Sequence, residues 1–177
     1  MASAGSDFGL TDEGRAQVHQ NVEHARGLVR GPVSVLSSPL LRARETAEIA
    51  AEIFGTRVDV DDRLIERDFG DFEMDSDCRY EEVWEIDRRD PTHRTWNVES
   101  VVEVLERLRR LTEELLPVSL EGAVILVTHG DVASTLICAS SGAPLSRHRE
   151  VGGLATGQIR ALDWPPTVEP PILVRDS

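Results

Sequence analysis

The sequence predicts an α/β fold in which a mainly parallel sheet carries helices on both faces, a three-layer sandwich. Short, continuously apolar segments alternate along the chain with longer segments whose apolar residues recur every three or four positions. Strands that alternate with helices in this way form parallel sheets. The best apolar segment, AVILV at residues 123–127, has no polar position, which is typical of a central strand covered on both faces.

The first half of the chain is expected to form two helices and two short strands: helix 10–28, strand 33–36, helix 39–54 and strand 57–60. Thr11 can cap the first helix, and the acidic residues that follow it suit a first helical turn. Pro32 and the glycine before it stop that helix. Gly55 ends the second helix, as glycines commonly do.

The second half is expected to begin with a long charged excursion and to continue with two helices and two strands. The expected elements are some helix over 80–87 within the excursion 62–97, then helix 98–116, strand 123–127, helix 132–139 and strand 158–162. The helix that starts at residue 98 shows the strongest helical periodicity, and Pro117 is expected to end it.

The length of 177 residues suits one domain that buries a core of ordinary size. We therefore predict a single domain over residues 1–177. Within it, residues 73–97 are expected to form a lid over a pocket, and the proline-rich residues 165–177 a tail on the surface. The sequence shows no internal repeat.

The composition excludes several classes of function. The chain is 40% hydrophobic but has no apolar run near 18 residues, so no membrane span is expected. A net charge of −13 argues against nucleic acid or an anionic membrane as a partner. The N-terminus lacks a signal peptide pattern and the two cysteines lack metal-site spacing, so we expect a cytoplasmic protein.

Polar residues follow two of the predicted strands where each strand ends. Ser37 and Ser38 follow the first strand, and His129 with Gly130 follows the strand at 123–127. Ligands of parallel sheets bind beyond the carboxyl ends of the strands. All 19 cationic side chains are arginines, so a phosphate site here has to use arginine, histidine and backbone amides.

Three side chains are candidates for such a site. Arg42 lies one turn into a helix that Ser38 is expected to cap, and helix N-termini attract anions. His129 is a candidate phosphate ligand, and Gly130 lets the backbone approach it. Glu66 is a polar residue beside the apolar pair Leu64-Ile65. The simpler interpretations stay open: a solvated helix arginine, a histidine satisfied at a strand end, and a surface carboxylate.

Three segments carry a resemblance to a known family: SSPLLRARETA (37–47), RLIERDFGDFE (63–73) and AVILVTHGDV (123–132). Together with LTDEGRAQV (10–18), they resemble the histidine phosphatase superfamily, which includes the cofactor-dependent phosphoglycerate mutases. The segment around Glu99 and Ser100 is similar to a Gly-Glu-Ser motif of that family, although Asn97-Val98 stand where glycine is expected. The resemblance covers most of the chain and implies a phosphoglycerate-mutase-like fold.

The resemblance also implies a reaction. Members of the family hydrolyse or transfer small phosphate esters without a metal, through a phosphohistidine intermediate. The resemblance implies that Glu66 and His129 are catalytic residues, with Glu66 as the proton donor. It also implies that four residues bind the substrate: Arg42, Ser37, Ser38 and Gly130. No cofactor and no metal are expected, and a phosphatase is favoured over a mutase. The partner is a small phosphorylated substrate, and the oligomeric state stays open, with a dimer among the options.

One segment of the family pattern does not occur in this chain. The attacking histidine belongs to an Arg-His-Gly motif that precedes the first helix, and the nine residues before Leu10 contain no histidine or arginine. Three explanations are open: a protein that begins further upstream, a truncated relative that binds phosphate esters without turnover, or replacement of the lost strand by ILVRDS (172–177). The alternative function is thus a non-catalytic phosphate-ester-binding pseudophosphatase.

Overall fold

The structure is a computed structural model that describes residues 8–73 and 79–162. Its sheet has three parallel strands: β1 (Val33–Ser37), β2 (Val58–Val60) and β3 (Ala123–Val127). Their order in the sheet is β2-β1-β3, and Val35 pairs with Val58 on one side and Ile125 on the other. The strands lie at or within one residue of the predicted ranges.

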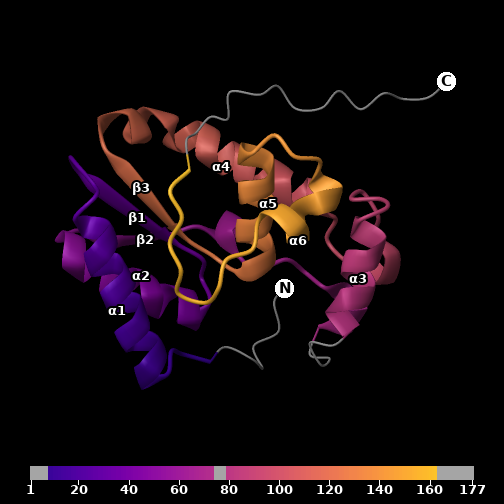
Figure 1. The fold of residues 1–177 in the computed structure, drawn as a ribbon, viewed down its shortest axis with the longest axis horizontal. Coiled ribbons are helices and arrows are strands. Elements are labelled where there is room, and N and C mark those ends of the chain that lie inside the picture. Colours follow the sequence, from indigo (N-terminus) through magenta and orange to yellow (C-terminus); the bar gives the residue numbers. More distant parts are fainter. Residues whose placement is uncertain (1–7, 74–78, 163–177) are drawn as a thin grey trace.

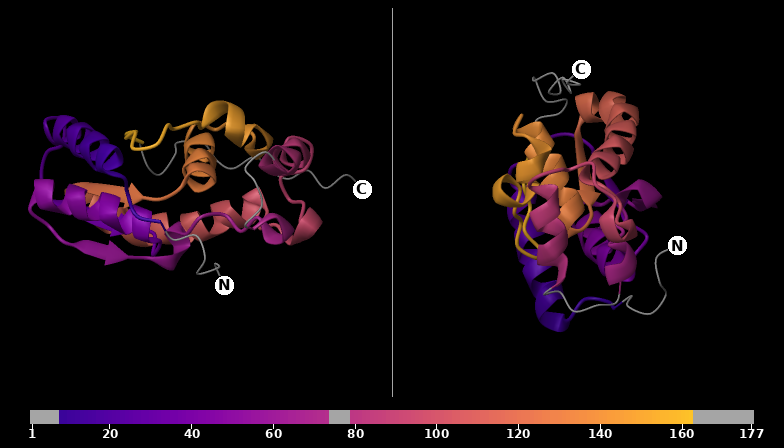
Figure 2. Two further views of the ribbon diagram at one scale, coloured as in Figure 1. Left: turned by 90° about the horizontal axis from the view of Figure 1, so that it is seen from below. Right: turned by 90° about the vertical axis from the view of Figure 1, so that its right-hand side faces the viewer.

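Helices connect the strands (Figure 1). They are α1 (Asp12–Arg26), α2 (Leu41–Phe54), α3 (Tyr80–Asp87), α4 (Val101–Glu121), α5 (Gly130–Ser140) and α6 (His148–Val151). As expected, Thr11 caps α1 by accepting a hydrogen bond from the Gly14 N–H, and Gly55 ends α2 in a left-handed conformation. The helix α1 and the helix α3 lie at opposite ends of the molecule (Figure 2).

Alternate residues of the strands face two different helical layers. Val35 lies in a cluster with buried residues of α1 and α2, and Ile125 and Val127 pack against the same cluster. Leu36 lies in a second cluster with α4 and α5, against which Leu126 packs. The sheet is therefore covered by α1 and α2 on one face and by α4 and α5 on the other. This arrangement confirms the predicted fold class.

The outer edge of β3 has no neighbouring strand within the described ranges. All five residues of β3 are apolar, yet each is only partly buried. The strand predicted at 158–162 is wrong: these residues have no regular structure, and four of the five are exposed. A strand needs a partner for its backbone groups, and the Gln158 N–H instead bonds within a local turn, to the carbonyl of Ala155.

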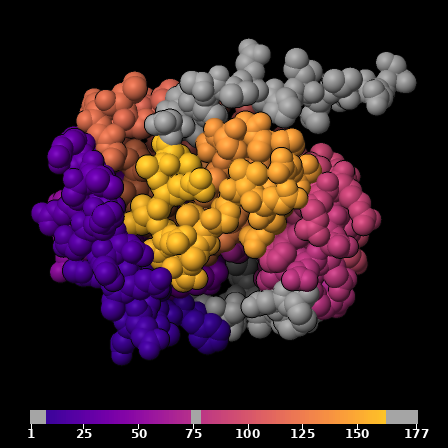
Figure 3. Space-filling model, in the orientation of Figure 1, coloured from indigo at the N-terminus to yellow at the C-terminus, as the bar shows by residue number. Residues whose placement is uncertain are grey.

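The segment that includes residues 158–162, where a strand was predicted, lies on the surface between α1 and the helices α5 and α6 (Figure 3). The Asn21 side chain donates a hydrogen bond of 2.9 Å to the carbonyl of Gly157, which fixes the segment on α1. At its far end, Leu162 packs against the cluster between α4 and α5. The segment therefore follows the helices rather than the sheet.

Two predicted helix boundaries are also wrong. Helix α2 begins at Leu41 rather than at Pro39, so Leu40 and not Ser38 is at the N-cap position. The Ser38 N–H continues the sheet by bonding to the carbonyl of Val127, and the Ser38 hydroxyl contacts His129. Helix α4 does not end before Pro117 but runs one turn further, to Glu121. A proline removes one N–H donor from a helix, which weakens it but need not end it.

The predicted surface tail at 165–177, the segment ILVRDS and residues 74–78 of the predicted lid lie outside the described residues. The described residues of the predicted lid contain α3 and the loop that follows it toward α4. No helix in the described ranges is long and apolar enough to span a lipid bilayer.

A glycine holds the loop after β2 against the residues that precede α4. Gly70 has a φ of 56°, and a Cβ built there would lie 2.2 Å from the carbonyl oxygen of Trp96. We expect Gly70→Ala to reduce the free energy of unfolding by about 1–3 kcal/mol, because backbone must move to admit the methyl group. Urea unfolding measures this loss. The control is Gly153→Ala, where the methyl group meets no atom within 4 Å; equal losses in both variants would contradict the expectation.

Candidate active site

The site begins at the carboxyl end of β1. Ser37 and Ser38 are fully buried there. The Ser37 hydroxyl donates to the carbonyl of Ser38 at 2.8 Å, and the Ser38 hydroxyl meets Nε2 of His129 at 2.7 Å. The backbone N–H of Leu40 also points to the Ser38 hydroxyl. Ser38 thus joins the end of β1 to the end of β3.

His129 follows β3 and stands at the first position before α5. The side chain is buried, with an exposed fraction of 8%. Burial, and after it the positive charges of Arg42 and Arg107, together lower the pKa of His129 to about 3. The imidazole is therefore neutral at pH 7. An anion placed between these groups would favour the protonated imidazole.

Glu66 lies in the loop between β2 and α3, partly buried. The hydroxyl of Thr128, the residue before His129, donates 2.7 Å to the carbonyl of Leu64 and so fixes this loop to the end of β3. Burial raises the pKa of Glu66 to about 7. The backbone N–H of Arg67, which donates 3.0 Å to the Glu66 carboxyl, opposes that rise.

The charges of the site show that these residues share one region. The positive charges of Arg42 and Arg107 act on both Glu66 and His129. Arg42 is the second residue of α2, and within the described part of the chain its guanidinium has no ion pair or hydrogen bond, which leaves its donors available. The structure therefore brings together Arg42, Glu66, His129, Ser37 and Ser38 at the carboxyl ends of β1 and β3.

Gly130 is the first residue of α5, and a Cβ there would meet no atom within 4 Å. The backbone in front of α5 is therefore open to a ligand, at a helix N-terminus that favours anions. Among the residues that the structure describes, no group of three or more histidine, cysteine, aspartate and glutamate side chains is arranged to hold a metal ion.

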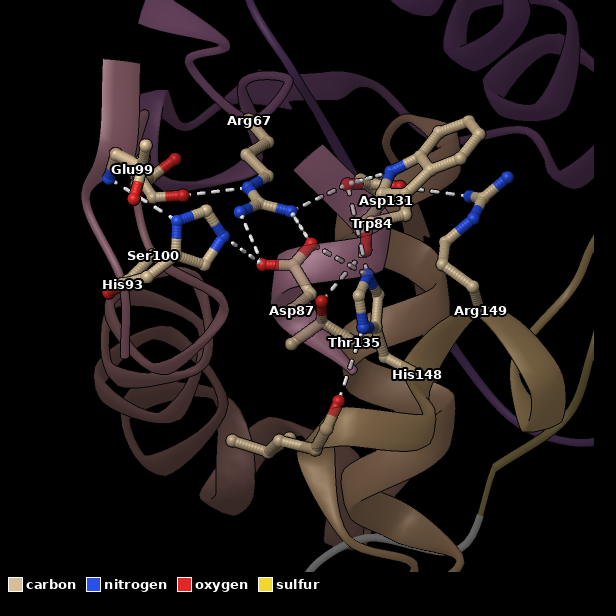
Figure 4. A network of polar contacts seen from close by, with 12 residues as sticks. Arg67, Trp84, Asp87, His93, Glu99, Ser100, Asp131, Thr135, His148 and Arg149 are labelled. Carbon is tan, nitrogen blue, oxygen red and sulfur yellow. Dashed lines mark hydrogen bonds and ion pairs between the residues drawn. The ribbon is translucent and has the colours of Figure 1, made fainter. Parts of the chain in front are cut away.

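A buried ionic network lies next to the site, and sequence reasoning missed it (Figure 4). Its centre is the Arg67 guanidinium, which is 1% exposed. This group donates to both carboxylate oxygens of Asp87 at 2.7 and 2.9 Å, and to Asp131 at 3.1 Å. Because Asp87 ends α3 and Asp131 lies in the first turn of α5, Arg67 ties the predicted lid to the helix that His129 precedes.

Further side chains complete this network. Trp84 and Arg149 each donate to Asp131, at 3.1 and 2.9 Å, and His93 bonds to Asp87 at 2.9 Å. Burial on its own raises the pKa of Asp131, but the His148 imidazole and the positive charges of Arg67 and Arg149 hold it at about 2. The network is therefore ionic at neutral pH, and its charges compensate one another.

The remaining histidines lie away from Glu66 and Arg42. His19 and His24 are exposed on α1, and His93 and His148 are buried in or beside the network. The Nε2 atom of His148 lies 3.9 Å from carboxylate oxygens of both Asp87 and Asp131, beyond hydrogen-bonding distance. Within the described ranges, His129 is thus the one imidazole at the ends of the strands.

Comparison with known proteins agrees with this geometry. The model of the histidine phosphatase superfamily (branch 1) matches residues 2–168. A probable phosphoglycerate mutase GpmB from Erwinia tasmaniensis is 32% identical over 151 residues, which cover 82% of this chain and 69% of that protein.

Two solved structures are similar over most of the chain. The mycobacterial glucosyl-3-phosphoglycerate phosphatase Rv2419c superposes with a TM-score of 0.71 at 29% identity, covering 85% of this chain and 76% of that one. A phosphoglycerate mutase from Thermus thermophilus superposes with a TM-score of 0.62 at 31% identity, covering 90% and 81%. The resemblance seen in the sequence is confirmed, and the chain belongs to the histidine phosphatase superfamily.

Proposed function

We propose that this protein is a phosphomonoester hydrolase of the histidine phosphatase type, acting on a small phosphorylated substrate through a phosphohistidine intermediate. The observation that carries the proposal is that Arg42 and Arg107 lie near enough to both His129 and Glu66, at the ends of β1 and β3, for their positive charges to lower the pKa of each. Arg42 and His129 bind the phosphoryl oxygens, supported by the backbone at Gly130 and by Ser37 and Ser38. Glu66 is the general acid and base.

In the proposed reaction an imidazole nitrogen attacks phosphorus in line while the bond to the ester oxygen breaks. Glu66, protonated, gives its proton to that oxygen, and the alcohol leaves. Glu66 then takes a proton from a water molecule that attacks the phosphohistidine, which releases orthophosphate and the free imidazole. Each step balances in charge and protons without a metal.

The attacking imidazole in this proposal comes from an Arg-His-Gly segment that pairs with the outer edge of β3. Two observations support such a position. The edge has no partner strand within the described ranges, and the apolar residues of β3 stay partly exposed. A parallel strand on this edge would end beside His129, because parallel strands have their carboxyl ends at the same edge of the sheet.

A second candidate function is a non-catalytic binder of phosphate esters. The specific observation in its favour is that the part of the chain that the structure describes has one histidine at the site, where the proposed reaction needs a nucleophile as well as His129. A mutase is a third candidate. Incubation with phosphoglycerate separates it from a hydrolase, because a mutase returns an isomer and a hydrolase returns orthophosphate.

An anion-binding measurement tests the site itself. We expect tungstate, a phosphate mimic, to raise the melting temperature, and a concentration of 100 times the dissociation constant corresponds to about 2.7 kcal/mol of stabilisation. Arg42→Gln and His129→Ala should remove most of this stabilisation. Arg44→Gln is the control, because Arg44 is exposed on the same helix, two residues away. A full response in the His129 variant would contradict the proposed site.

Turnover of an aryl phosphate then separates hydrolase from binder. The assay uses the 177-residue chain and a longer chain that includes any in-frame codons upstream of Met1. Hydrolysis that His129→Ala abolishes supports the hydrolase. Stabilisation by tungstate with no turnover in either chain supports the non-catalytic binder.

A further inference from the structure

The loop that carries Glu66 contacts Glu99, the residue directly before the N-cap of α4. The Glu99 N–H donates 2.8 Å to the carbonyl of Asp68, and the Glu99 carbonyl accepts 2.7 Å from Nε of Arg67. The Glu99 carboxylate lies near the backbone N–H of Asp68 as well, at 3.4 Å. These contacts hold the two residues that follow Glu66 in the chain.

Arg107 holds the same loop on the other side of Glu66. Its guanidinium forms a bidentate pair with the Glu99 carboxylate, with distances of 2.8 and 3.1 Å. Its third nitrogen donates a short hydrogen bond to the carbonyl of Arg63. The side chains of Arg107 and Glu99 are only 16% and 21% exposed, so solvent competes weakly for this pair.

From these contacts we infer that Glu99 and Arg107 form a clamp that positions Glu66 and places a fixed positive charge beside it. Glu99 and Arg107 are positioning residues, since they act through Glu66. The inference rests on the proposed role of Glu66 and assigns a role to two residues whose own side chains carry out no chemical step. Displacement of an acid by about 1 Å can slow a reaction by about 100-fold, which is why such support matters.

The charges around Glu66 show what the guanidinium does there. Burial is the largest influence and raises the pKa of Glu66, and the negative charge of Asp131 on α5 raises it as well. The positive charges of Arg42 on α2 and Arg107 on α4 lower it. The two arginines therefore keep the carboxyl able to release its proton, which an acid that also acts as a base requires.

The segment before Glu99 has Asn97-Val98 where the family pattern has a glycine, and its backbone conformation shows how the clamp forms without that glycine. Trp96 and Asn97 both have left-handed conformations, with φ values of 59° and 60°. Asparagine tolerates this conformation better than most residues, and the Asn97 side chain donates 2.9 Å to Asp71. Val98, which directly precedes Glu99, has an ordinary extended conformation with a φ of −67°, so this position does not need a glycine, and Ser100 still caps α4 together with Glu103.

The test is the titration of the Glu66 carboxyl, followed by NMR in protein labelled at glutamate and assigned with Glu66→Gln. Arg107→Gln should move the midpoint of Glu66 to higher pH. Arg107→Lys keeps the charge but loses the bidentate pair, so its midpoint should stay near that of the unmodified protein. Arg110→Gln, exposed on the same helix, is the matched control and should change nothing. An unchanged midpoint in Arg107→Gln would overturn the inference.

A kinetic measurement tests the positioning itself. In protein that turns over, Arg107→Lys and Glu99→Gln should lower kcat for alkyl phosphates by about 10- to 100-fold with little change in KM. Full activity in both variants would overturn the clamp. The two proposals can fail separately. If Arg107→Gln shifts the midpoint of Glu66 but Glu66→Gln has no effect on turnover, the proposed function is wrong and the clamp is still supported.

Discussion

Replacement of Glu66 by glutamine should slow the cleavage of phosphate esters with poor leaving groups by about 10²–10⁴-fold. Glutamine has the shape of the protonated acid but has no proton to give to the departing oxygen. A nitrophenolate leaves without protonation, so its ester should lose far less. The measurement is kcat/KM over a series from alkyl to nitrophenyl phosphates. Equal losses across the series would rule out the acid role.

The same variant should change the dependence of the rate on pH. Because burial raises the pKa of Glu66 to about 7, the carboxyl is protonated below this pH and ionised above it. Hydrolysis of alkyl phosphates should therefore fall as the pH rises through about 7. This limb should disappear in Glu66→Gln and persist in Glu85→Gln, which changes an exposed carboxylate on α3.

A stability measurement checks the same pKa without any turnover. The folded-state pKa of Glu66 lies above its ordinary value of 4.5, so the folded protein holds this proton more tightly than the unfolded chain does. Glu66 therefore lowers the free energy of unfolding as the pH rises from about 4.5 to about 7. We expect Glu66→Gln to be more stable than the unmodified protein at about pH 8 and equally stable at about pH 4, as measured by urea unfolding.

The elements that sequence reasoning predicted well are those that depend on their own residues. The apolar run at 123–127 forms β3, and the periodic segment that starts at residue 98 forms most of α4. The strand at 158–162 could not be judged in this way, because a strand depends on a neighbour that the segment itself does not encode. Pro117 shows the opposite case, in which a local stop signal was too weak to end a helix that packs along one face.

Some residues of the candidate site could also be predicted from the sequence, and others could not. Ser38, Arg42 and His129 stand at strand ends or near a helix start, where their positions indicated a ligand, whereas Glu66 was indicated by the resemblance to the family. Arg107 gave no such sign, since it lies within a helix that contains several other arginines. Its partner Glu99 is eight residues away and lies before the helix begins, outside the i,i+3 and i,i+4 spacings at which helical side chains pair, so the sequence pattern alone did not indicate the pair.

The largest loss of stability is expected from removal of Asp87. This carboxylate is fully buried at the end of α3 and forms a bidentate pair with Arg67. Asp87→Ala leaves the Arg67 guanidinium without its main counter-ion in a site closed to water. Removing one partner of a buried pair costs about 3–5 kcal/mol. Urea unfolding of Asp87→Ala measures the loss, with Glu85→Ala, exposed on the same helix, as the control.

A double variant shows whether the loss comes from the stranded charge. If it does, Asp87→Leu combined with Arg67→Met should recover most of the stability, because apolar residues of similar volume replace a buried pair at little cost. A loss below about 1 kcal/mol in Asp87→Ala would instead mean that the pair behaves like an exposed salt bridge. The Arg67 guanidinium also contacts the surroundings of the candidate active site, because Arg67 follows Glu66 in the chain and bonds to Asp131 of α5. Asp87 therefore stabilises the attachment of α3 and the loop of the proposed acid through one guanidinium.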